Sequence, residues 1–224
     1  MFFSKFLKLA TVTLFFSNPF LLESLNKYQL PFTESTAQAQ TVFTPSPQAA
    51  NRWQVLTSKD AQFSVLMPPG NPQKDIVEKS SGQYKIQFHS FALPDQKGLY
   101  YLVAHTNILP FLPESMTPEE QEVFFEAFAK GMLSQVPNAQ VRSTRSLTSN
   151  DFLGQEMDVE APDGVFVRMR IFLANSRIYM LMVGMETPSL AQSADVSQFF
   201  DSFNLVDSQT PVVSQKRSKS VFNP

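Results

Sequence analysis

The chain has 224 residues, of which 43% are hydrophobic and 17% charged, and its formal net charge is -2 at pH 7. This length and composition suit one globular domain, and the weak net charge gives no electrostatic sign of nucleic-acid binding. The chain contains no cysteine, which excludes disulfides, thiolate nucleophiles and metal sites built on cysteine ligands.

The N-terminal segment carries the features of an export signal in their usual order. Lys5 precedes and Lys8 interrupts an apolar run, Leu7–Phe16, that is too short to span a bilayer. A small-residue cleavage site follows at Ala37-Gln38-Ala39. Residues 1–39 are therefore expected to direct export. Because the interval before the cleavage site contains acidic and basic residues, the alternative is a retained amphipathic anchor on a membrane surface.

Three further regions follow the export signal. Residues 40–51, which include two prolines, are expected to form an extended linker. Residues 52–206 are expected to form a single folded domain. The Ser-rich segment 207–224, which carries Lys216, Arg217 and Lys219, is predicted to be disordered.

The first part of the domain reads as two β-hairpins, because apolar and polar residues alternate along four short segments. Phe63, Val65 and Met67, for example, share one face of the second segment. The run Pro68–Pro72 ends that strand, and no further strand is predicted before Tyr84. The predicted pairs are Arg52–Ser58 with Gln62–Pro68, and Tyr84–Ala92 with Leu99–Asn107.

A strongly marked helix start lies in the middle of the chain. Thr117 is placed to cap the helix, Pro118 fits the first helical position, and Glu120 completes a capping box. A broad apolar stripe follows at helical spacing, and the helix must end before Pro137. The stripe comprises Phe124, Phe125, Phe128, Ala129, Met132 and Leu133.

The most strongly patterned stretch is Gly164–Gly184, which predicts a β-hairpin turning at Asn175-Ser176. A preceding strand, Leu153–Ala161, closes on it through the turn at 162–164, and a weaker strand is expected at Gln140–Leu147. Both hairpins set the same apolar face, so the register of this three-strand meander is well specified. The expected opposite pairs are Leu173 with Ile178, Ile171 with Met180, Met169 with both Met182 and Met157, Val159 with Val167, Asp158 with Arg168, and Glu156 with Arg170.

After Gly184 a second helix is predicted from apolar residues at positions i, i+3, i+4 and i+7, which are Val196, Phe199, Phe200 and Phe203. The chain thus runs strands, helix, strands, helix, with short hairpin links. That order predicts an α+β domain in which two main helices pack on an antiparallel β-sheet.

Together these features resemble the PsbP-type family, an α/β/α sandwich shared with a small nuclear-import factor. The resemblance covers about residues 52–206 and includes the capped helix and the meander. Because these residues form a core and not a chemical signature, the resemblance transfers no binding residues to this chain. The motifs that carry it are Trp53, Phe63-Ser64-Val65-Leu66-Met67-Pro68 and Phe199-Phe200-Asp201-Ser202-Phe203.

The resemblance implies an exported, non-enzymatic protein. Separately, no cofactor is expected. Members of the PsbP-type family are typically proteins of the thylakoid lumen or the periplasm, and many act in the assembly or stabilisation of photosynthetic complexes. With the export signal, the expected compartments are the periplasm, the thylakoid lumen or the cell surface.

His89 and His105 are the only histidines, and they lie on the two strands that we pair across a turn near Asp95–Lys97. That pairing brings them near each other, on the same or on different faces of the sheet. A carboxylate such as Asp95 or Glu114 would complete a metal site. We favour the alternative, in which both are partly exposed strand residues with ordinary hydrogen bonds, because two histidines without a third ligand motif are weak evidence.

Four arginines are a second candidate site. Arg168 and Arg170 could form an anion-binding face with Arg142 and Arg145. Acidic residues stand opposite the first two in the predicted register, so a solvated cross-strand charge ladder explains them better.

Two pairs of adjacent aromatic residues lie on the predicted helices, Phe124-Phe125 and Phe199-Phe200. Either each stripe is broad enough to bury both rings, which we favour, or one ring belongs to an exposed patch for a partner. The loop Phe111-Leu112-Pro113 is a further candidate, since apolar loop tips often contact another molecule.

Several sequence motifs of catalysis and nucleotide binding are missing, namely G-x-S-x-G, G-x-G-x-x-G and G-x-x-x-x-G-K-[ST]. The predicted function is therefore that of an exported, non-catalytic domain that binds or stabilises a partner protein, without nucleic acid, and that reaches a membrane surface if its N-terminus is not cleaved. The alternative is a small-molecule or metal-binding periplasmic protein, and a hydrolase ranks third.

Overall fold

The computed structural model describes the central part of the chain. Three predicted segments lie wholly or mostly outside the described residues. They are the export signal at 1–39, the linker at 40–51 apart from residues 41–42, and the disordered tail at 207–224. The described residues are 41–42, 52–81, 84–94, 97–110, 112, 116–133, 136, 138–149, 152–161 and 164–205.

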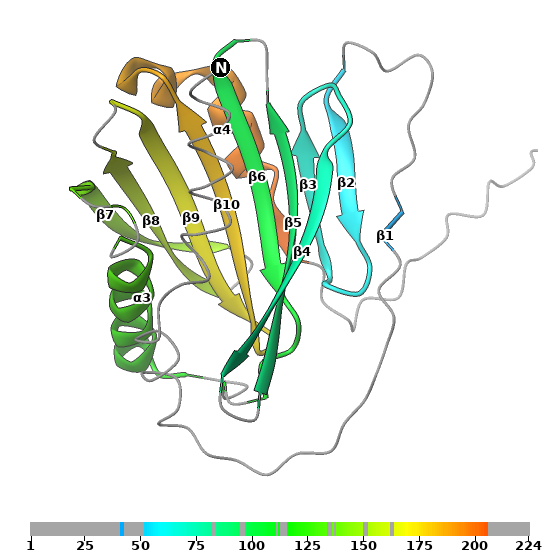
Figure 1. Ribbon diagram of the computed structural model, residues 1–224, viewed down its shortest axis with the longest axis vertical. Helices are drawn as coiled ribbons and strands as arrows, with labels where there is room; N and C mark the ends of the chain where they lie inside the picture. The colour runs from blue at the N-terminus through cyan, green and yellow to red at the C-terminus, as the bar shows by residue number, and fades with distance from the viewer. Residues whose placement is uncertain are drawn as a thin grey trace, which may run out of the picture.

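A seven-stranded sheet organises the domain, and every neighbouring pair of its strands is antiparallel (Figure 1). The predicted α+β class with an antiparallel sheet is therefore confirmed. In spatial order the strands are β4 (Gln73–Ser81), β5 (Tyr84–Pro94), β6 (Leu99–Thr106), β10 (Arg177–Met185), β9 (Phe166–Ala174), β8 (Phe152–Glu160) and β7 (Gln140–Ser149).

A smaller sheet and the helices lie over the two faces of this large sheet (Figure 1). The smaller sheet has four strands and is also antiparallel, in the order β1-β2-β3-β11. These elements are β1 (Thr41–Val42), β2 (Gln54–Ser58), β3 (Phe63–Met67), β11 (Asn204–Leu205), α3 (Pro118–Leu133), the 3-10 helix η1 (Pro188–Gln192) and α4 (Ala194–Asp201).

Each face of the large sheet holds its own apolar core. On one face, α3 covers side chains of β6, β8, β9 and β10. On the other face, α4 and the smaller sheet cover β5, β6, β10 and part of β9. Strand β10 contributes to both cores and is buried from Ile178 to Met185. That position explains why its sequence is apolar on both sides instead of alternating.

The predicted register of the meander is confirmed at every expected pair in β8, β9 and β10. Leu173 lies opposite Ile178, next to the two-residue turn. Asn175 and Ser176 in that turn have φ values of 51° and 53°. Positive φ at both central residues is typical of a type I′ turn, whose twist matches that of the two strands.

The predicted helix start is confirmed in α3. The backbone N–H of Glu120 donates to Thr117 Oγ1 at 3.3 Å, and the backbone N–H of Thr117 donates to Glu120 Oε2 at 2.9 Å. These reciprocal bonds are a capping box. Both adjacent aromatic pairs are buried, with every ring at most 7% exposed, so the broad apolar stripe is confirmed and neither pair forms an exposed patch. Their rings are those of Phe124, Phe125, Phe199 and Phe200.

The structure also corrects the sequence interpretation in several places. Strands β1, β4 and β11 were not predicted, because β4 is a mostly exposed strand with mixed charges and β1 and β11 have two residues each. Phe203, predicted in the second helix, follows the end of α4 at Asp201. Leu112 is buried at 3% exposure, so it is not the exposed loop tip that its loop suggested. Phe111 and Pro113 lie outside the described residues.

Candidate functional site

The face of the large sheet that carries α4 is only partly covered. Apolar side chains fill the space under α4 and the smaller sheet, whereas β8 and the adjoining part of β9 present charged side chains on this face. We call these residues and their β7 partners the charge ladder. Its members are Ser143 and Arg145 on β7, Glu156 and Asp158 on β8, and Arg168 and Arg170 on β9.

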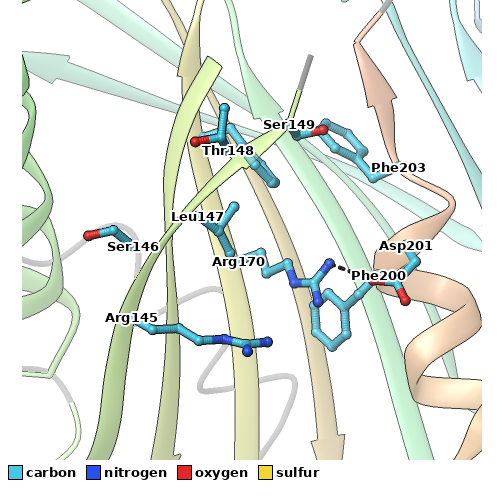
Figure 2. Close-up of a pocket in the computed structure, with 10 residues that line it drawn as sticks. Arg145, Ser146, Leu147, Thr148, Ser149, Arg170, Phe200, Asp201 and Phe203 are labelled. Atoms are coloured by element: carbon cyan, nitrogen blue, oxygen red, sulfur yellow. Dashed lines mark hydrogen bonds and ion pairs between the residues drawn. The ribbon is translucent and has the colours of Figure 1, made fainter. Parts of the chain in front are cut away.

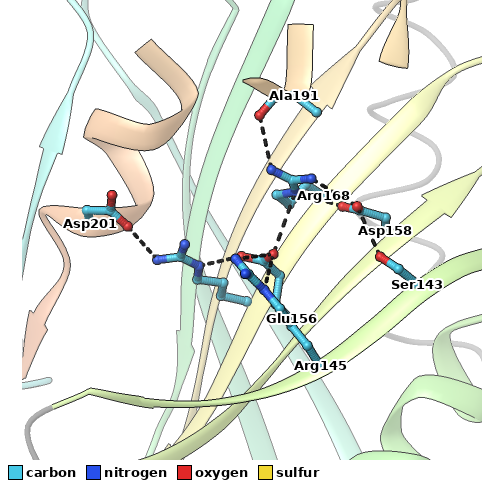
Figure 3. A network of polar contacts seen from close by, with 8 residues as sticks. Ser143, Arg145, Glu156, Asp158, Arg168, Ala191 and Asp201 are labelled. Carbon is cyan, nitrogen blue, oxygen red and sulfur yellow. Dashed lines mark hydrogen bonds and ion pairs between the residues drawn. The ribbon is translucent and has the colours of Figure 1, made fainter. Parts of the chain in front are cut away.

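Glu156 is the centre of the charge ladder, and it is only 4% exposed. Its Oε1 lies 2.7 Å from Arg145 Nη2, and its Oε2 lies 2.7 Å from Arg170 Nε (Figure 3). Arg168 Nε lies 3.8 Å from the same carboxylate. A buried carboxylate is stable only when such partners replace its hydration, and here three guanidinium groups do so.

Asp158 forms the second rung of the charge ladder. Arg168 donates to its two oxygens from Nε at 2.7 Å and from Nη2 at 2.9 Å, and Ser143 Oγ donates at 3.1 Å. Burial alone would raise the pKa of Asp158, but the hydrogen bonds and positive charge of Arg168 hold that pKa below its ordinary value. The same bonds raise the pKa of Arg168. Both groups are therefore charged at neutral pH.

Three contacts tie the charge ladder to the elements after β10. Arg168 Nη1 donates to the backbone oxygen of Ala191 in η1 at 3.0 Å. Arg170 Nη1 donates to Asp201 Oδ1 in α4 at 2.9 Å, and its guanidinium carbon lies 4.9 Å from the centre of the Phe200 ring (Figure 2). The position of α4 on the sheet is thus fixed by ionic, cation–π and apolar contacts together.

A groove of about 360 Å³ lies between α4 and the end of β7 (Figure 2). The rings of Phe172 and Phe203 stack with centres 5.2 Å apart on its apolar side. Gly154 makes room for the first of these rings, since a Cβ at position 154 would lie 2.6 Å from Phe172 Cδ1. The groove is lined by Arg145, Ser146, Leu147, Thr148, Ser149, Arg170, Phe172, Phe200, Asp201 and Phe203.

The charged side chains that line the groove are engaged in ion pairs. The four arginines predicted as a possible anion-binding face each contact a carboxylate, and the charges of these arginines and carboxylates balance. The inner part of the ladder is buried, so it is not the fully solvated ladder that the sequence indicated. The lining residues include hydroxyl groups but no histidine to activate them.

The two histidines lie side by side on the α4 face. The β5–β6 register puts His89 directly opposite His105, and their rings stack with centres 4.9 Å apart and planes 6° apart. His105 Nδ1 lies 3.1 Å from the backbone oxygen of Thr106. A carbonyl oxygen only accepts, so Nδ1 carries the proton in this bond. The sequence prediction that the two residues meet is confirmed, and they share one face. The favoured interpretation that both are partly exposed is wrong for His105, which is 5% exposed.

Burial lowers the pKa of His105 to about 3, and burial also lowers the pKa of His89. The positive charges of Lys74 and Arg177 act in the same direction on both rings. Within the described ranges, no group of three or more His, Asp or Glu residues is placed to hold a metal ion. Asp95 and Glu114, the predicted third ligands, are outside those ranges. A metal site at the two histidines stays a prediction.

No model of a known protein family matches the sequence, and no curated protein matches it either. Among solved structures, the cyanobacterial PsbP of Synechocystis matches 73% of this chain and 98% of that chain, at 8% identity and a TM-score of 0.48. A Pseudomonas aeruginosa protein of unknown function, described as a putative regulator, matches 62% of this chain and 85% of that chain, at 9% identity and a TM-score of 0.30. These identities and TM-scores assign neither a family nor a function to this chain.

Proposed function

We propose that this chain is an exported, non-catalytic domain that binds a partner protein outside the cytoplasm. One observation carries the proposal: the ionisable groups of the charge ladder satisfy one another, while next to them the large sheet ends in the exposed strand β7. An open sheet edge is a ready template for another chain, and proteins usually cover or shorten such edges unless they use them.

The exposure of β7 supports the same function. Its residues from Gln140 to Ser146 are all exposed, and the strand has ten residues, which is long for an open edge. The few other exposed large apolar side chains among the described residues are on separate elements, for example Val55 on β2 and Val123 on α3. They do not compete with β7 as a docking surface.

Export and compartment remain part of this proposal. They rest on the N-terminal pattern, which predicts the periplasm, the thylakoid lumen or the cell surface. The resemblance to PsbP-type proteins suggests family membership and a partner that belongs to a membrane-associated or photosynthetic complex. None of the described helices has both the length and the apolar character required to cross a membrane. Mass spectrometry of the mature N-terminus after cell fractionation tests the compartment.

Site-specific photo-crosslinking in the native cell tests partner binding. A photoreactive amino acid is placed at Ser146 on β7 in one strain and at Val123 on α3 in another, because both side chains are exposed on different elements. We expect a discrete protein adduct from position 146 that position 123 does not give. Identical adducts from both positions, or none from either, would contradict the proposal.

The absence of catalysis is proposed as well. The groove has hydroxyl groups without a histidine beside them, which is a poor arrangement for acyl or glycosyl transfer. Turnover of any member of an ester and glycoside panel, lost on substitution of a groove residue such as Ser149→Ala, would overturn this part.

Metal binding is the second candidate function, because the sheet register places His89 against His105. The nitrogen lone pairs of a histidine ring lie in the plane of that ring. Because the two rings are stacked with nearly parallel planes, their lone pairs do not converge on one point, so binding a metal would require one ring to change its rotamer. Metal analysis of protein purified without a His tag decides the question. Stoichiometric metal that is lost in the His89→Ala variant would favour this candidate over the first.

A further inference from the structure

The charge ladder alternates in sign across the sheet and ends at its open edge. Arg170 on β9 lies opposite Glu156 on β8, which lies opposite Arg145 on β7. Two residues along, Phe172 lies opposite Gly154, which lies opposite Leu147. The same face therefore carries one charged row and one apolar row, and both rows stop at β7.

Arg145 is the outermost member of the charged row, and its side chain is 64% exposed. Its contacts to Glu156 use Nε and Nη2, at 2.8 and 2.7 Å. A guanidinium group has five N–H donors, so a second carboxylate can approach the outer side of the same group. The next position in the row favours an acidic residue, since opposite charges on facing residues stabilise a strand pair.

The regular part of β7 is long enough for such a pairing. A β-bulge lies between Val141 and Ser143, and from Ser143 to Ser149 the pairing with β8 runs without a break. Bulges protect sheet edges locally, so the bulge confines any added strand to Ser143–Ser149. Within the described residues, β7 has no strand on its outer side.

We propose that β7 receives an extended acidic segment of a partner protein as an eighth, antiparallel strand. In this arrangement an acidic side chain lies opposite Arg145 and an apolar side chain, two residues earlier in the partner, lies opposite Leu147. Leu147 is half-buried against the core under α4, so the apolar side chain extends that core outward. The inference rests on the proposed function and specifies the chemistry of the partner.

Charge distinguishes the partner from the other possible occupants. The tail of this chain carries Lys216, Arg217 and Lys219 and would face Arg142 and Arg145 with the same sign. A second copy pairing through its own β7 would also bring only basic charges together, because β7 contains two arginines and no acidic residue. The opposite edge, β4, has both acidic and basic residues and offers no such preference.

The test uses the full chain, labelled for NMR, and a capped seven-residue peptide of threonines with valine at its third position and glutamate at its fifth. In the proposed register the valine lies opposite Leu147 and the glutamate opposite Arg145. A peptide with lysine in place of glutamate is the charge control. A peptide with N-methyl groups on alternate backbone nitrogens is the hydrogen-bond control, and the amides of β4 serve as the internal control.

We expect amide shifts confined to Ser143–Ser149 and the neighbouring strand β8, and weaker binding of the lysine peptide by about two- to five-fold. The N-methylated peptide is expected to bind undetectably, because it cannot form the ladder hydrogen bonds. In the Arg145→Glu variant the lysine peptide is expected to bind more tightly than the glutamate peptide. The spectrum of each variant shows at once whether it is folded.

The inference is overturned if the peptides cause no shifts at millimolar concentration, if the shifts map to β4, or if N-methylation leaves binding unchanged. Sedimentation of the protein alone would reveal self-pairing, which would also overturn it. An adduct at Ser146 in the cell, together with any of these results, would leave the proposed partner binding intact and reject only strand addition. If neither a discrete adduct at Ser146 nor peptide binding at β7 is found, the proposed function itself is rejected.

Discussion

The two faces of the large sheet are built from the same strands, yet among the described residues only one of them buries a charged side chain. Most residues that face α3 on β8 and β9 are apolar, for example Met157 and Met169. Their neighbours Glu156 and Arg170 point to the α4 side. Among the described residues, no charged side chain is buried on the α3 face, whereas Glu156 is buried on the other. The alternation of a β-strand separates the two environments completely.

The difference follows from the size of the covering elements. Helix α3 has 16 residues and its apolar stripe closes the core over β8 and β9. Helix α4 has eight residues, and among the described residues its contacts with the charge ladder are those of Asp201 and Phe200 with Arg170. The α3 face is therefore closed and contributes stability, whereas the α4 face leaves polar groups at the β7 edge where another molecule can reach them.

The largest expected effect comes from removing the charge at the centre of the ladder. In Glu156→Gln, the neutral amide leaves the guanidinium groups of Arg168 and Arg170, which are mostly buried, without their shared carboxylate. Breaking a buried ionic network in this way costs about 3–5 kcal/mol of unfolding free energy. Chemical denaturation monitored by far-UV circular dichroism measures the loss.

Two controls decide whether burial causes that loss. Glu160→Gln removes a carboxylate on the same strand whose side chain is 38% exposed, and we expect a cost below about 1 kcal/mol. Met157→Leu changes the adjacent residue on the α3 face with little change in volume, at a cost below about 1.5 kcal/mol. Equal losses from both Glu variants would show that the burial of Glu156 is not the cause of its larger expected cost.

The second effect is a dependence of stability on pH that comes from the α4 face. His105 is buried and its pKa falls to about 3 in the folded protein, against an ordinary value of 6.5. Between these values the unfolded chain binds a proton that the folded chain does not, so stability falls as the pH is lowered from 6.5. The expected loss between pH 7.5 and pH 4.5 is about 2–3 kcal/mol, read from denaturation curves across the range.

The groups that face His105 set the control for this titration. His89 stacks on it, and Lys74 and Arg177 add positive charge. The pKa of Asp158 is lowered from 3.8, so its ion pair is lost only below that pH and leaves the window above pH 4.5 unaffected. The variant His105→Phe is expected to remove most of the slope between pH 6.5 and pH 4.5. An unchanged slope in that variant would assign the effect to other groups.

A third effect concerns Gly154, the β8 member of the apolar row, which lies against Phe172. Gly154→Ala places a methyl group 2.6 Å from Phe172 Cδ1 and 2.7 Å from the backbone oxygen of Ile171, so the ring or the strand has to move. We expect a loss of about 1–3 kcal/mol, the usual cost of overpacking. Ser146→Ala on the exposed edge serves as the control and is expected to stay within about 0.5 kcal/mol. A fully stable Gly154→Ala variant would show that the groove wall yields easily.

The contrast between the faces was partly predictable from the sequence. The register of β8, β9 and β10 followed from alternation, because a shift by one residue would have put Arg168 and Arg170 into the α3 core. The strand β4 could not be found in the same way. Its side chains are mostly exposed, so burial imposes no alternation, and pairing with β5 alone keeps it in the sheet.

The site was less predictable than the fold. The sequence paired Glu156 with Arg170, but the burial of that carboxylate depends on how η1 and α4 settle on the sheet. The groove joins residues near 147, 172 and 203, which only the tertiary structure brings together. The histidines were predicted to meet, yet their shared face followed from the register of β5 and β6, which the sequence of the intervening turn did not determine.

The smallest expected effect lies on the solvent side of the α3 face, where the covering helix begins. Thr117→Ala removes the side-chain acceptor for the Glu120 N–H, and the expected cost is about 1 kcal/mol, because the helix end is exposed and water partly replaces the bond. Thr187→Ala is the matched control. Thr187 holds the same position before η1 but its side chain makes no capping hydrogen bond, so its loss is expected to stay within about 0.5 kcal/mol. Thermal denaturation of the two variants side by side makes the measurement, and a loss within about 0.5 kcal/mol from Thr117→Ala would show that the capping box contributes little to holding α3 over its core.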